Sequence, residues 1–306
     1  MMVFLKHKTV TFIKNTNRMT IMPFSSHFKK RYIVYSLVVF YVVMCQSCVT
    51  MRYSNKETRK FFATSKTAFK DSTILFDGYK IHYVTTGSDQ NPTLFFVHGS
   101  PGSWNAFKEY LLDTLLLKKY RMIAIDRPGF GYSDFGNAQS LKEQSQRIAA
   151  FIKKIDNKKP LILVGHSVGG PVVSQLAVDH PSWYSRLVIL AGSLDPKAEN
   201  PEKWRAVIKA SPLRYLIPGA LRPSNDELWW LKKDLVLLQP ELKKITCDVT
   251  IIHGTKDVLV PYSNVAFMKI MLVNAKSIDT LTIEKANHFI PWSHYVIVRD
   301  ALLKIQ

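Results

Sequence analysis

The sequence predicts an α/β fold with a doubly wound, mostly parallel sheet of eight strands and a small helical lid. Short, continuous apolar runs alternate with segments of helical spacing over most of the chain. Strands that are apolar on both faces are typical of a sheet covered by helices on both sides. A hairpin signal opens this pattern, and one irregular, aromatic insertion interrupts it in the C-terminal half.

The first two strands are expected on either side of Asp77-Gly78, in residues 72–76 and 79–84. Asp-Gly between alternating apolar residues is a strong signal for a two-residue hairpin turn. Helical spacing is clearest in residues 140–155 and 171–178, which lie between buried apolar runs. The six further strands are expected at residues 93–97, 121–125, 161–164, 187–190, 249–252 and 277–283.

The composition divides the chain into three parts. Residues 1–48 are predicted to be a signal peptide or membrane anchor, residues 49–70 a polar and basic tether, and residues 71–306 one α/β domain. Residues 195–246 hold several aromatic residues and prolines in an irregular pattern, which is typical of a lid inserted over the sheet. With 47% hydrophobic residues the chain can bury a core without disulfides or a structural metal.

The basic charge is concentrated before the domain. Residues 1–60 carry 11 Lys and Arg and a single acidic residue, Glu57, so this stretch holds more than half of the formal charge of +19. Basic residues around a hydrophobic segment favour membrane insertion and contact with anionic lipid. The sequence contains no nucleic-acid-binding module, so no nucleic-acid partner is expected.

The N-terminal part has the pattern of a secretory signal. The cluster Lys29-Lys30-Arg31 precedes residues 32–44, which carry no charge and are short for a helix that spans a bilayer. The following Cys45-Gln46-Ser47-Cys48 resembles the processing site of bacterial lipoproteins, and this resemblance implies a lipid on Cys48 and an extracytoplasmic, membrane-anchored protein. An uncleaved anchor, a cleaved signal of a secreted or periplasmic protein, and a buried N-terminal helix remain as alternatives.

A nucleophile turn is predicted at Gly165-His166-Ser167-Val168-Gly169. This G-x-S-x-G pattern follows an expected strand and precedes an expected helix, which is the context that the motif requires. Glycines on both sides of the serine leave room for a strained turn that lifts the hydroxyl above the sheet edge. The N-terminus of the next helix favours negative charge at the same place.

With these flanks, residues 73–306 resemble the serine branch of the α/β-hydrolase superfamily. The His98-Gly99-Ser100-Pro101-Gly102 segment is similar to its oxyanion loop, which implies that the backbone N–H groups of Ser100 and Val168 stabilise the developing oxyanion. The segment Asp126-Arg127-Pro128-Gly129-Phe130-Gly131 is similar to the loop that shapes the site after the fourth strand.

The resemblance also implies the two partners of Ser167. A serine hydroxyl needs a base, and the base needs an orienting carboxylate. The loop ending in Gly254-Thr255-Lys256-Asp257 places Asp257 as the acid, and His288, after the last expected strand, is the base. Asp195 is the rival acid and His294 the rival base. All three predicted members follow carboxyl ends of strands, where this type of sheet forms its sites.

These residues predict a serine hydrolase that cleaves a carboxylic ester of a small molecule through an acyl-enzyme, without metal or organic cofactor. An aromatic lid suits an acyl chain, and we recognise no acidic cluster there for the free amine of a peptide. The alternatives are a proline iminopeptidase-like enzyme, a C–C bond hydrolase and an inactive hydrolase-like binding protein. The oligomeric state stays open. The tryptophans expected to line the pocket are Trp104, Trp204, Trp229 and Trp230.

Overall fold

The computed structural model describes residues 26–47, 49–210 and 212–305. The chain divides into two compact units, residues 1–41 and residues 42–306. The second unit contains the α/β domain together with the segment that leads into it. Each unit is described by itself below.

One eight-stranded sheet forms the centre of the second unit, in the order β1-β2-β4-β3-β5-β6-β7-β8. β1 pairs antiparallel with β2, and β2 pairs antiparallel with β4; every other neighbouring pair is parallel. The predicted fold class, a mostly parallel sheet opened by a hairpin, is therefore confirmed. The strands are β1 (Phe69–Phe76), β2 (Tyr79–Thr86), β3 (Thr93–Val97), β4 (Arg121–Ile125), β5 (Leu161–His166), β6 (Arg186–Leu190), β7 (Asp248–Gly254) and β8 (Ser277–Ile283).

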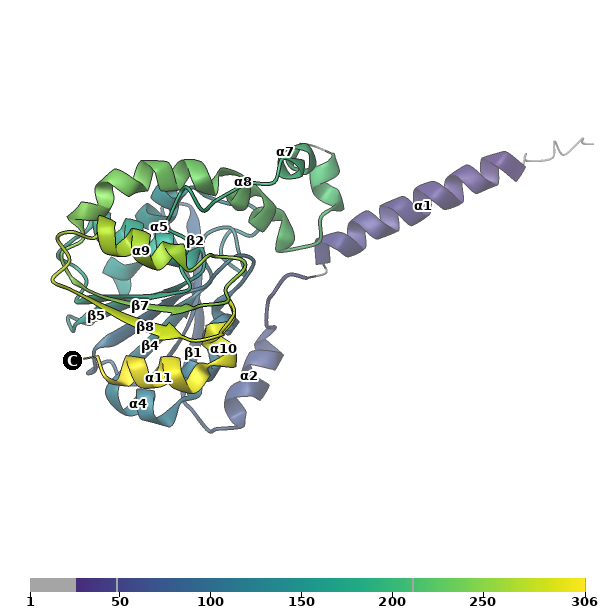
Figure 1. The fold of residues 1–306 in the computed structure, drawn as a ribbon. Coiled ribbons are helices and arrows are strands. Elements are labelled where there is room, and N and C mark those ends of the chain that lie inside the picture. The colour runs from purple at the N-terminus through teal and green to yellow at the C-terminus, as the bar shows by residue number, and fades with distance from the viewer. Residues whose placement is uncertain (1–25, 48, 211, 306) are drawn as a thin grey trace, which may run out of the picture. The chain divides into compact units, whose positions relative to one another are not determined.

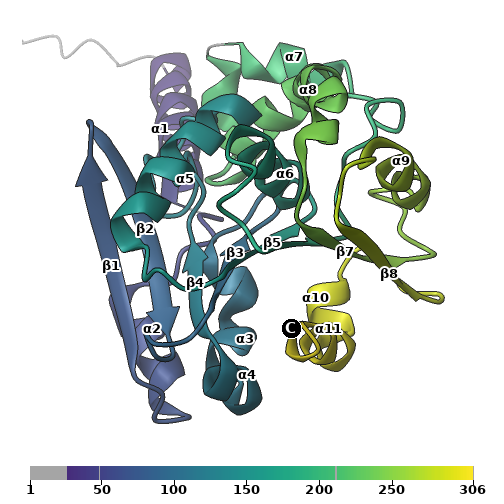
Figure 2. The same ribbon diagram turned by 90° about the vertical axis from the view of Figure 1, so that its left-hand side faces the viewer.

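Helices cover both faces of this sheet (Figures 1 and 2). α5, α6 and α9 pack on one face with Phe95 and Leu163, and α3, α4 and α11 pack on the other with Phe96 and Met122. This double cover explains why β3 and β4 are buried at every position. The helices are α3 (Lys108–Leu112), α4 (Thr114–Lys119), α5 (Leu141–Ile155), α6 (Gly169–Asp179), α9 (Ser263–Met271), α10 (Ile290–Ser293) and α11 (Tyr295–Leu303), with a 3-10 turn η1 (Trp104–Phe107).

Local sequence determines where α5 begins. Ser140 caps the helix: its side chain accepts from the Glu143 N–H, and the Glu143 carboxylate accepts from the Ser140 N–H. This capping box satisfies two helix-end donors. Ile148 and Ile152, four residues apart, then share the face that is buried against the sheet.

The insertion between β6 and β7 is helical, as expected of a lid. It consists of α7 (Trp204–Lys209), η2 (Leu213–Leu216), α8 (Leu221–Leu238) and η3 (Gln239–Lys244). α8 extends along the edge of the domain where α5 and α9 end (Figure 1). Leu231 and Leu235 of α8 join the core on the α5 face, so the long lid helix is packed on the domain.

The segment between residues 49 and 70, predicted to be a polar tether, contains a helix that packs against the domain. It contains α2 (Asn55–Ala63), which Ser54 and Glu57 begin with a second capping box. Phe62 of α2 is 1% exposed and stacks on Phe69 with ring centroids 4.3 Å apart. The polar composition of this segment did not indicate a packed helix, because only two adjacent phenylalanines, Phe61 and Phe62, make its apolar contacts.

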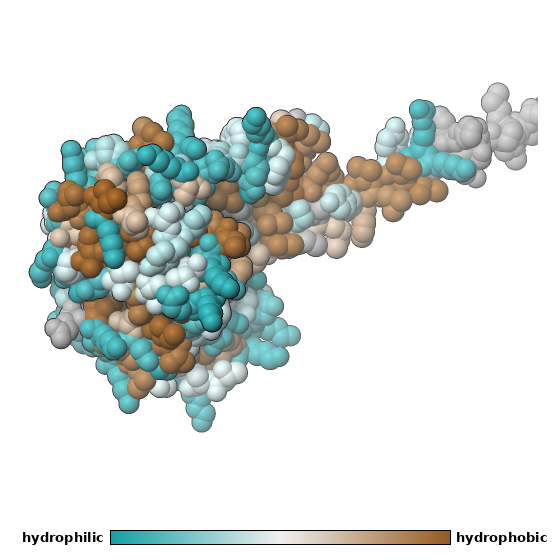
Figure 3. All heavy atoms as spheres, viewed as in Figure 1, coloured by the Kyte–Doolittle hydropathy of each residue, from teal (hydrophilic) through white to brown (hydrophobic). Residues whose placement is uncertain are grey.

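The N-terminal helix α1 (Ser26–Ser47) contains the uncharged stretch that the sequence singled out. Its apolar side chains between Tyr32 and Met44 are exposed except for that of Val42, which is half-buried (Figure 3). Among the described residues, no helix is long and apolar enough to cross a membrane. Cys48, the predicted lipid-attachment residue, lies outside the described residues.

Candidate active site

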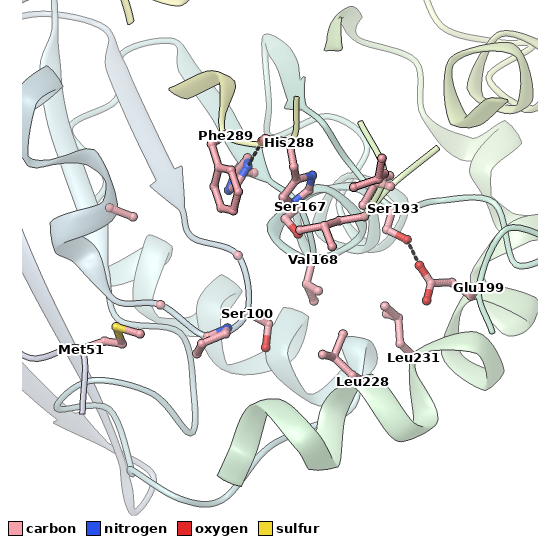
Figure 4. A pocket seen from close by; sticks show the side chains of 18 of the residues that line it. Met51, Ser100, Ser167, Val168, Ser193, Glu199, Leu228, Leu231, His288 and Phe289 are labelled. Atoms are coloured by element: carbon pink, nitrogen blue, oxygen red, sulfur yellow. Dashed lines mark hydrogen bonds between the residues drawn. The ribbon is translucent and has the colours of Figure 1, made fainter. Parts of the chain in front are cut away.

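Ser167 and His288 line one cavity of about 820 Å³ beneath the lid. The cavity lies at the carboxyl ends of the parallel strands, because Ser167 follows β5 and His288 follows β8. Figure 4 shows both side chains at the centre of its wall. This volume is within the range of small-molecule binding sites.

Ser167 occupies a strained turn between β5 and α6. Its φ is 55°, in the left-handed region that side chains other than glycine rarely adopt. A Cβ atom at Gly165 would collide with the carbonyl oxygen of Gly169, and a Cβ atom at Gly169 would collide with the carbonyl oxygen of Val97, so each glycine of the motif permits a close backbone approach. The strain at Ser167 presents its hydroxyl to the cavity, as the nucleophile-turn motif predicts.

His288 and Asp257 are joined by a short hydrogen bond. His288 Nδ1 donates to Asp257 Oδ2 at 2.7 Å, and both side chains are buried. Asp257 Oδ1 accepts from the N–H groups of Leu259 and Val260 at 3.0 and 2.8 Å. Burial alone would raise the pKa of Asp257, but the contacts with His253 and His288 and the Val260 N–H hold it well below its usual range. The carboxylate is thus ionised and fixed in orientation.

The rival residues lie elsewhere. Asp195 Oδ1 accepts from the Lys197 N–H at 2.8 Å, and its own N–H donates to Asn264; no contact joins Asp195 to a histidine of the described chain. His294 pairs through Nδ1 with the hydroxyl of its neighbour Ser293 and does not line the cavity. The geometry therefore favours Asp257 and His288 for the acid and the base.

Ser100 and Val168, the residues predicted to supply the oxyanion donors, lie in the same cavity as Ser167. Ser100 and Val168 both line the cavity, one from the loop after β3 and the other from the start of α6. Within the described chain, neither N–H group donates to a backbone carbonyl. Gly99 brings the two loops together, since a Cβ atom on Gly99 would lie 2.9 Å from Ser167 Cβ. Both N–H groups are available to an oxyanion.

Three other histidines have structural contacts. His98 Nδ1 contacts the Gly99 carbonyl oxygen at 2.7 Å, and its Nε2 accepts from the Arg127 N–H at 3.0 Å. His253 Nε2 donates to the Val260 carbonyl oxygen at 2.9 Å. His166 Nε2 lies 3.1 Å from the carbonyl oxygen of His288, and burial, with His288 nearby, lowers the pKa of His166 to about 3. A neutral His166 therefore donates to that carbonyl and supports the loop that carries His288.

The tryptophan predictions for the pocket are wrong. Trp104 is 1% exposed and packs in the core below the sheet, because η1 points it away from the cavity. Trp204 is 50% exposed and pairs with Arg205. Leu228 and Leu231 are the α8 residues that line the cavity. Residues 229 and 230, one and two positions after Leu228, are turned by about 100° and 200° around the helix, so Trp229 and Trp230 point elsewhere.

The cavity wall contains residues that sequence reasoning missed. Met51 comes from the segment before α2, and its carbonyl oxygen accepts from Ser103 Oγ at 2.6 Å and from Asn105 Nδ2 at 3.0 Å. Phe289 and Trp292, one and four positions after His288, supply an aromatic edge. Their position next to the predicted base was the one signal in the sequence that could have identified them.

Two acidic side chains of the lid reach the cavity, where the sequence showed no acidic cluster for the free amine of a peptide. Glu199 and Glu202 both line it. Glu202 is neutralised by Arg205, whose Nε donates to Glu202 Oε2 at 2.5 Å. Glu199 accepts from Ser193 Oγ, and burial raises the pKa of Glu199. The irregular spacing of residues 195–203 gave no indication of which side chains point inward.

Comparison with known proteins supports the same class of fold. A family model described as the alpha/beta hydrolase fold matches residues 92–216. Epoxide hydrolase 1 of Caenorhabditis elegans is 33% identical over 112 residues, which is 36% of this chain and 27% of that protein. The pimeloyl-[acyl-carrier protein] methyl ester esterase of Vibrio atlanticus (strain LGP32) is 36% identical over 123 residues, which is 39% of this chain and 44% of that protein. The chain spans less than half the length of these curated relatives.

Solved structures agree over a larger part of the chain. The crystal structure of a bacterial membrane phospholipase A covers 90% of this chain and 100% of that one, with a TM-score of 0.58 and 19% sequence identity. At that identity the likeness shows the fold alone. The sheet order and the nucleophile turn of this chain agree with the fold that the family model describes. The chain has the α/β-hydrolase fold.

Proposed function

We propose that this protein is a serine hydrolase that cleaves a carboxylic ester through an acyl-enzyme. The observation that carries the proposal is that Ser167, held at a φ of 55°, shares one cavity with a His288 that is hydrogen-bonded to Asp257. Superfamily relatives include esterases and epoxide hydrolases. Epoxide hydrolysis in this superfamily uses a carboxylate nucleophile, and a serine stands at that position here, so the ester is favoured.

In the proposed mechanism the hydroxyl oxygen of Ser167 attacks the ester carbonyl carbon, and His288 Nε2 takes the hydroxyl proton. Asp257 holds the ring through Nδ1 and stabilises the imidazolium. The N–H groups of Ser100 and Val168 donate to the tetrahedral oxyanion, a contribution of a few kcal/mol in such sites. His288 then gives its proton to the departing alkoxide. Water, deprotonated by the same ring, releases the carboxylic acid and restores Ser167.

An ester and amide panel tests this proposal. The full-length protein should hydrolyse short aryl esters, and Ser167→Ala should lose that activity while keeping its thermal unfolding transition. Pro-aminoacyl substrates provide the comparison. Turnover of only the latter would support an aminopeptidase, and a folded protein that turns over neither would support a binding role.

We also propose that residues 1–48 attach the protein to the extracytoplasmic side of a membrane. This proposal is supported by the exposed apolar side chains of α1, which follow the basic residues Lys30 and Arg31 in the sequence. Attachment would use either a lipid on Cys48 or α1 itself. Cys48→Ser should release the protein into the soluble fraction if lipid is the anchor, whereas retention would assign the anchoring to the helix.

A further inference from the structure

Glu199 is a carboxylate in the catalytic cavity that no cation of the described chain contacts directly, although the charges of Lys232 and Arg205 act on it from further away. Ser193 Oγ donates to Glu199 Oε1, and the nearby Lys232 Nζ donates to the Glu199 backbone carbonyl oxygen at 2.9 Å. Over the described part of the chain, no Lys, Arg or His nitrogen lies within 4.0 Å of this carboxylate. The neighbouring Glu202 differs, because Arg205 pairs with it at 2.5 Å.

Burial of a carboxylate is costly unless a charge or hydrogen-bond donor compensates it. Glu199 is partly buried, and one serine hydroxyl supplies a single neutral hydrogen bond to it. Apolar residues Leu228, Leu231 and Val260 line the same cavity. A hydrogen-bond donor or cation of the bound substrate would supply the missing contact to the Glu199 carboxylate and stabilise its ionised form.

The position of Glu199 relates it to the reacting atoms. In Figure 4, Glu199 and Ser193 lie to one side of Ser167, and Ser100 and Met51 lie to the other. The Ser193 N–H donates to the Ser167 carbonyl oxygen at 3.4 Å, so the residue that orients Glu199 is hydrogen-bonded to the nucleophile turn. A substrate whose carbonyl lies at Ser167 can therefore extend one end toward Glu199.

We propose that Glu199 is a specificity-determining residue that binds an ammonium group of the substrate, so that the enzyme prefers esters carrying a primary amine on one side of the scissile carbonyl. This inference rests on the proposed ester hydrolase activity and names the substrate class of that site. A charge-assisted hydrogen bond to an ammonium contributes about twice as much as a neutral one, which makes a carboxylate selective for amines over hydroxyls. Glu202, already paired, takes no comparable part.

The test compares three esters of equal length that end in a primary ammonium, a hydroxyl or a methyl group, with the variable end placed on the acyl side in one series and on the alcohol side in another. For wild-type protein we expect kcat/KM to be at least ~10-fold higher for the ammonium ester than for the methyl ester in one of the series. In Glu199→Gln, which keeps the size of the side chain, this ratio should fall to about one. In Glu241→Gln, which removes an exposed carboxylate that does not line the cavity, it should stay close to the wild-type ratio.

The outcomes separate the two proposals. Equal kcat/KM values for the three wild-type esters, a preference for the hydroxyl ester, or a Glu199→Gln variant that retains the ammonium preference would each overturn the role of Glu199. If Glu199→Gln lowers kcat/KM by the same factor for all three esters, Glu199 has a structural role and the proposal is overturned as well. If wild-type protein turns over none of the esters, the proposed ester hydrolase activity itself fails.

Discussion

Arg127 and Glu227 form a buried, bidentate ion pair that joins the loop after β4 to lid helix α8. Arg127 Nη2 donates to Glu227 Oε1 at 2.8 Å, and Nη1 donates to Oε2 at 2.9 Å. The guanidinium is fully buried and also donates to the Gly99 carbonyl oxygen at 3.0 Å. One cation thus holds the lid and the oxyanion loop together.

Glu227→Gln should destabilise the protein by about 3–5 kcal/mol, because it leaves the Arg127 charge buried without its counter-ion. Urea unfolding measures this loss. Glu241→Gln removes an exposed pair with Lys244 and should leave the unfolding midpoint close to that of wild type. If both variants unfold at the same urea concentration, Arg127 and Glu227 do not form a buried pair in solution.

The orienting acid can be identified by two matched substitutions. Asp257→Asn removes the charge that fixes His288 and should lower kcat for an aryl ester by roughly 10⁴-fold. Asp195→Asn should keep kcat within a few-fold of wild type, because Asp195 contacts no histidine in the described chain. The reverse ranking of the two variants would assign the acid to the loop after β6.

Much of the fold and of the candidate site could be predicted because the apolar pattern of each strand also determines its place in the sheet. The candidate site residues follow directly after such strands. The apolar runs of β3 to β7 form neighbouring parallel strands, so the loops after their carboxyl ends meet at one edge of the sheet. Asp257 and His288 are 31 positions apart, yet each follows one of two adjacent parallel strands. Their convergence follows from the strand order.

The lid could not be predicted in the same way. Which face of α8 meets the cavity depends on how the helix is rotated, and Trp229, Trp230 and Leu231 are consecutive residues that point in three directions. No pattern in the sequence indicates how far the helix is rotated about its axis. Similarly, Met51 reaches the cavity through hydrogen bonds of its backbone carbonyl with Ser103 and Asn105, which depend on no feature of the methionine side chain.

Because of His82, the free energy of unfolding should decrease at alkaline pH. Its Nε2 lies 2.7 Å from Asp71 Oδ1 and its Nδ1 lies 2.8 Å from Asp126 Oδ2. Burial would lower the pKa of His82, but the two carboxylates outweigh it and raise the pKa from 6.5 to about 9. Protonated His82 therefore contributes at most ~3 kcal/mol to the free energy of unfolding. This contribution is complete below pH about 6.5 and is lost as the pH rises through about 9.

Urea unfolding at several pH values between 6 and 10 checks this expectation. Wild-type stability should fall across that window, and His82→Gln should show a smaller fall because it cannot carry the proton. Identical pH profiles for the two proteins would exclude a charged His82 between Asp71 and Asp126.

Phe62→Ala tests whether the segment before β1 is part of the folded domain. Phe62 is 1% exposed and contacts the rings of Phe69 and Trp104, so its truncation should cost about 3–5 kcal/mol. Leu75→Ala, at a side chain that is 66% exposed, should change stability by less than about 0.5 kcal/mol. Equal stabilities of the two variants would show that α2 is undocked in solution.

The central claim is that the hydroxyl of Ser167 is an activated nucleophile. Labelling of the folded, full-length protein with a fluorophosphonate, followed by mass spectrometry of its peptides, tests this most directly. The account predicts one phosphonylated residue, Ser167, with labelling lost in Ser167→Ala and strongly slowed in His288→Gln. Labelling at another residue, or a folded protein that takes up no label, would contradict it.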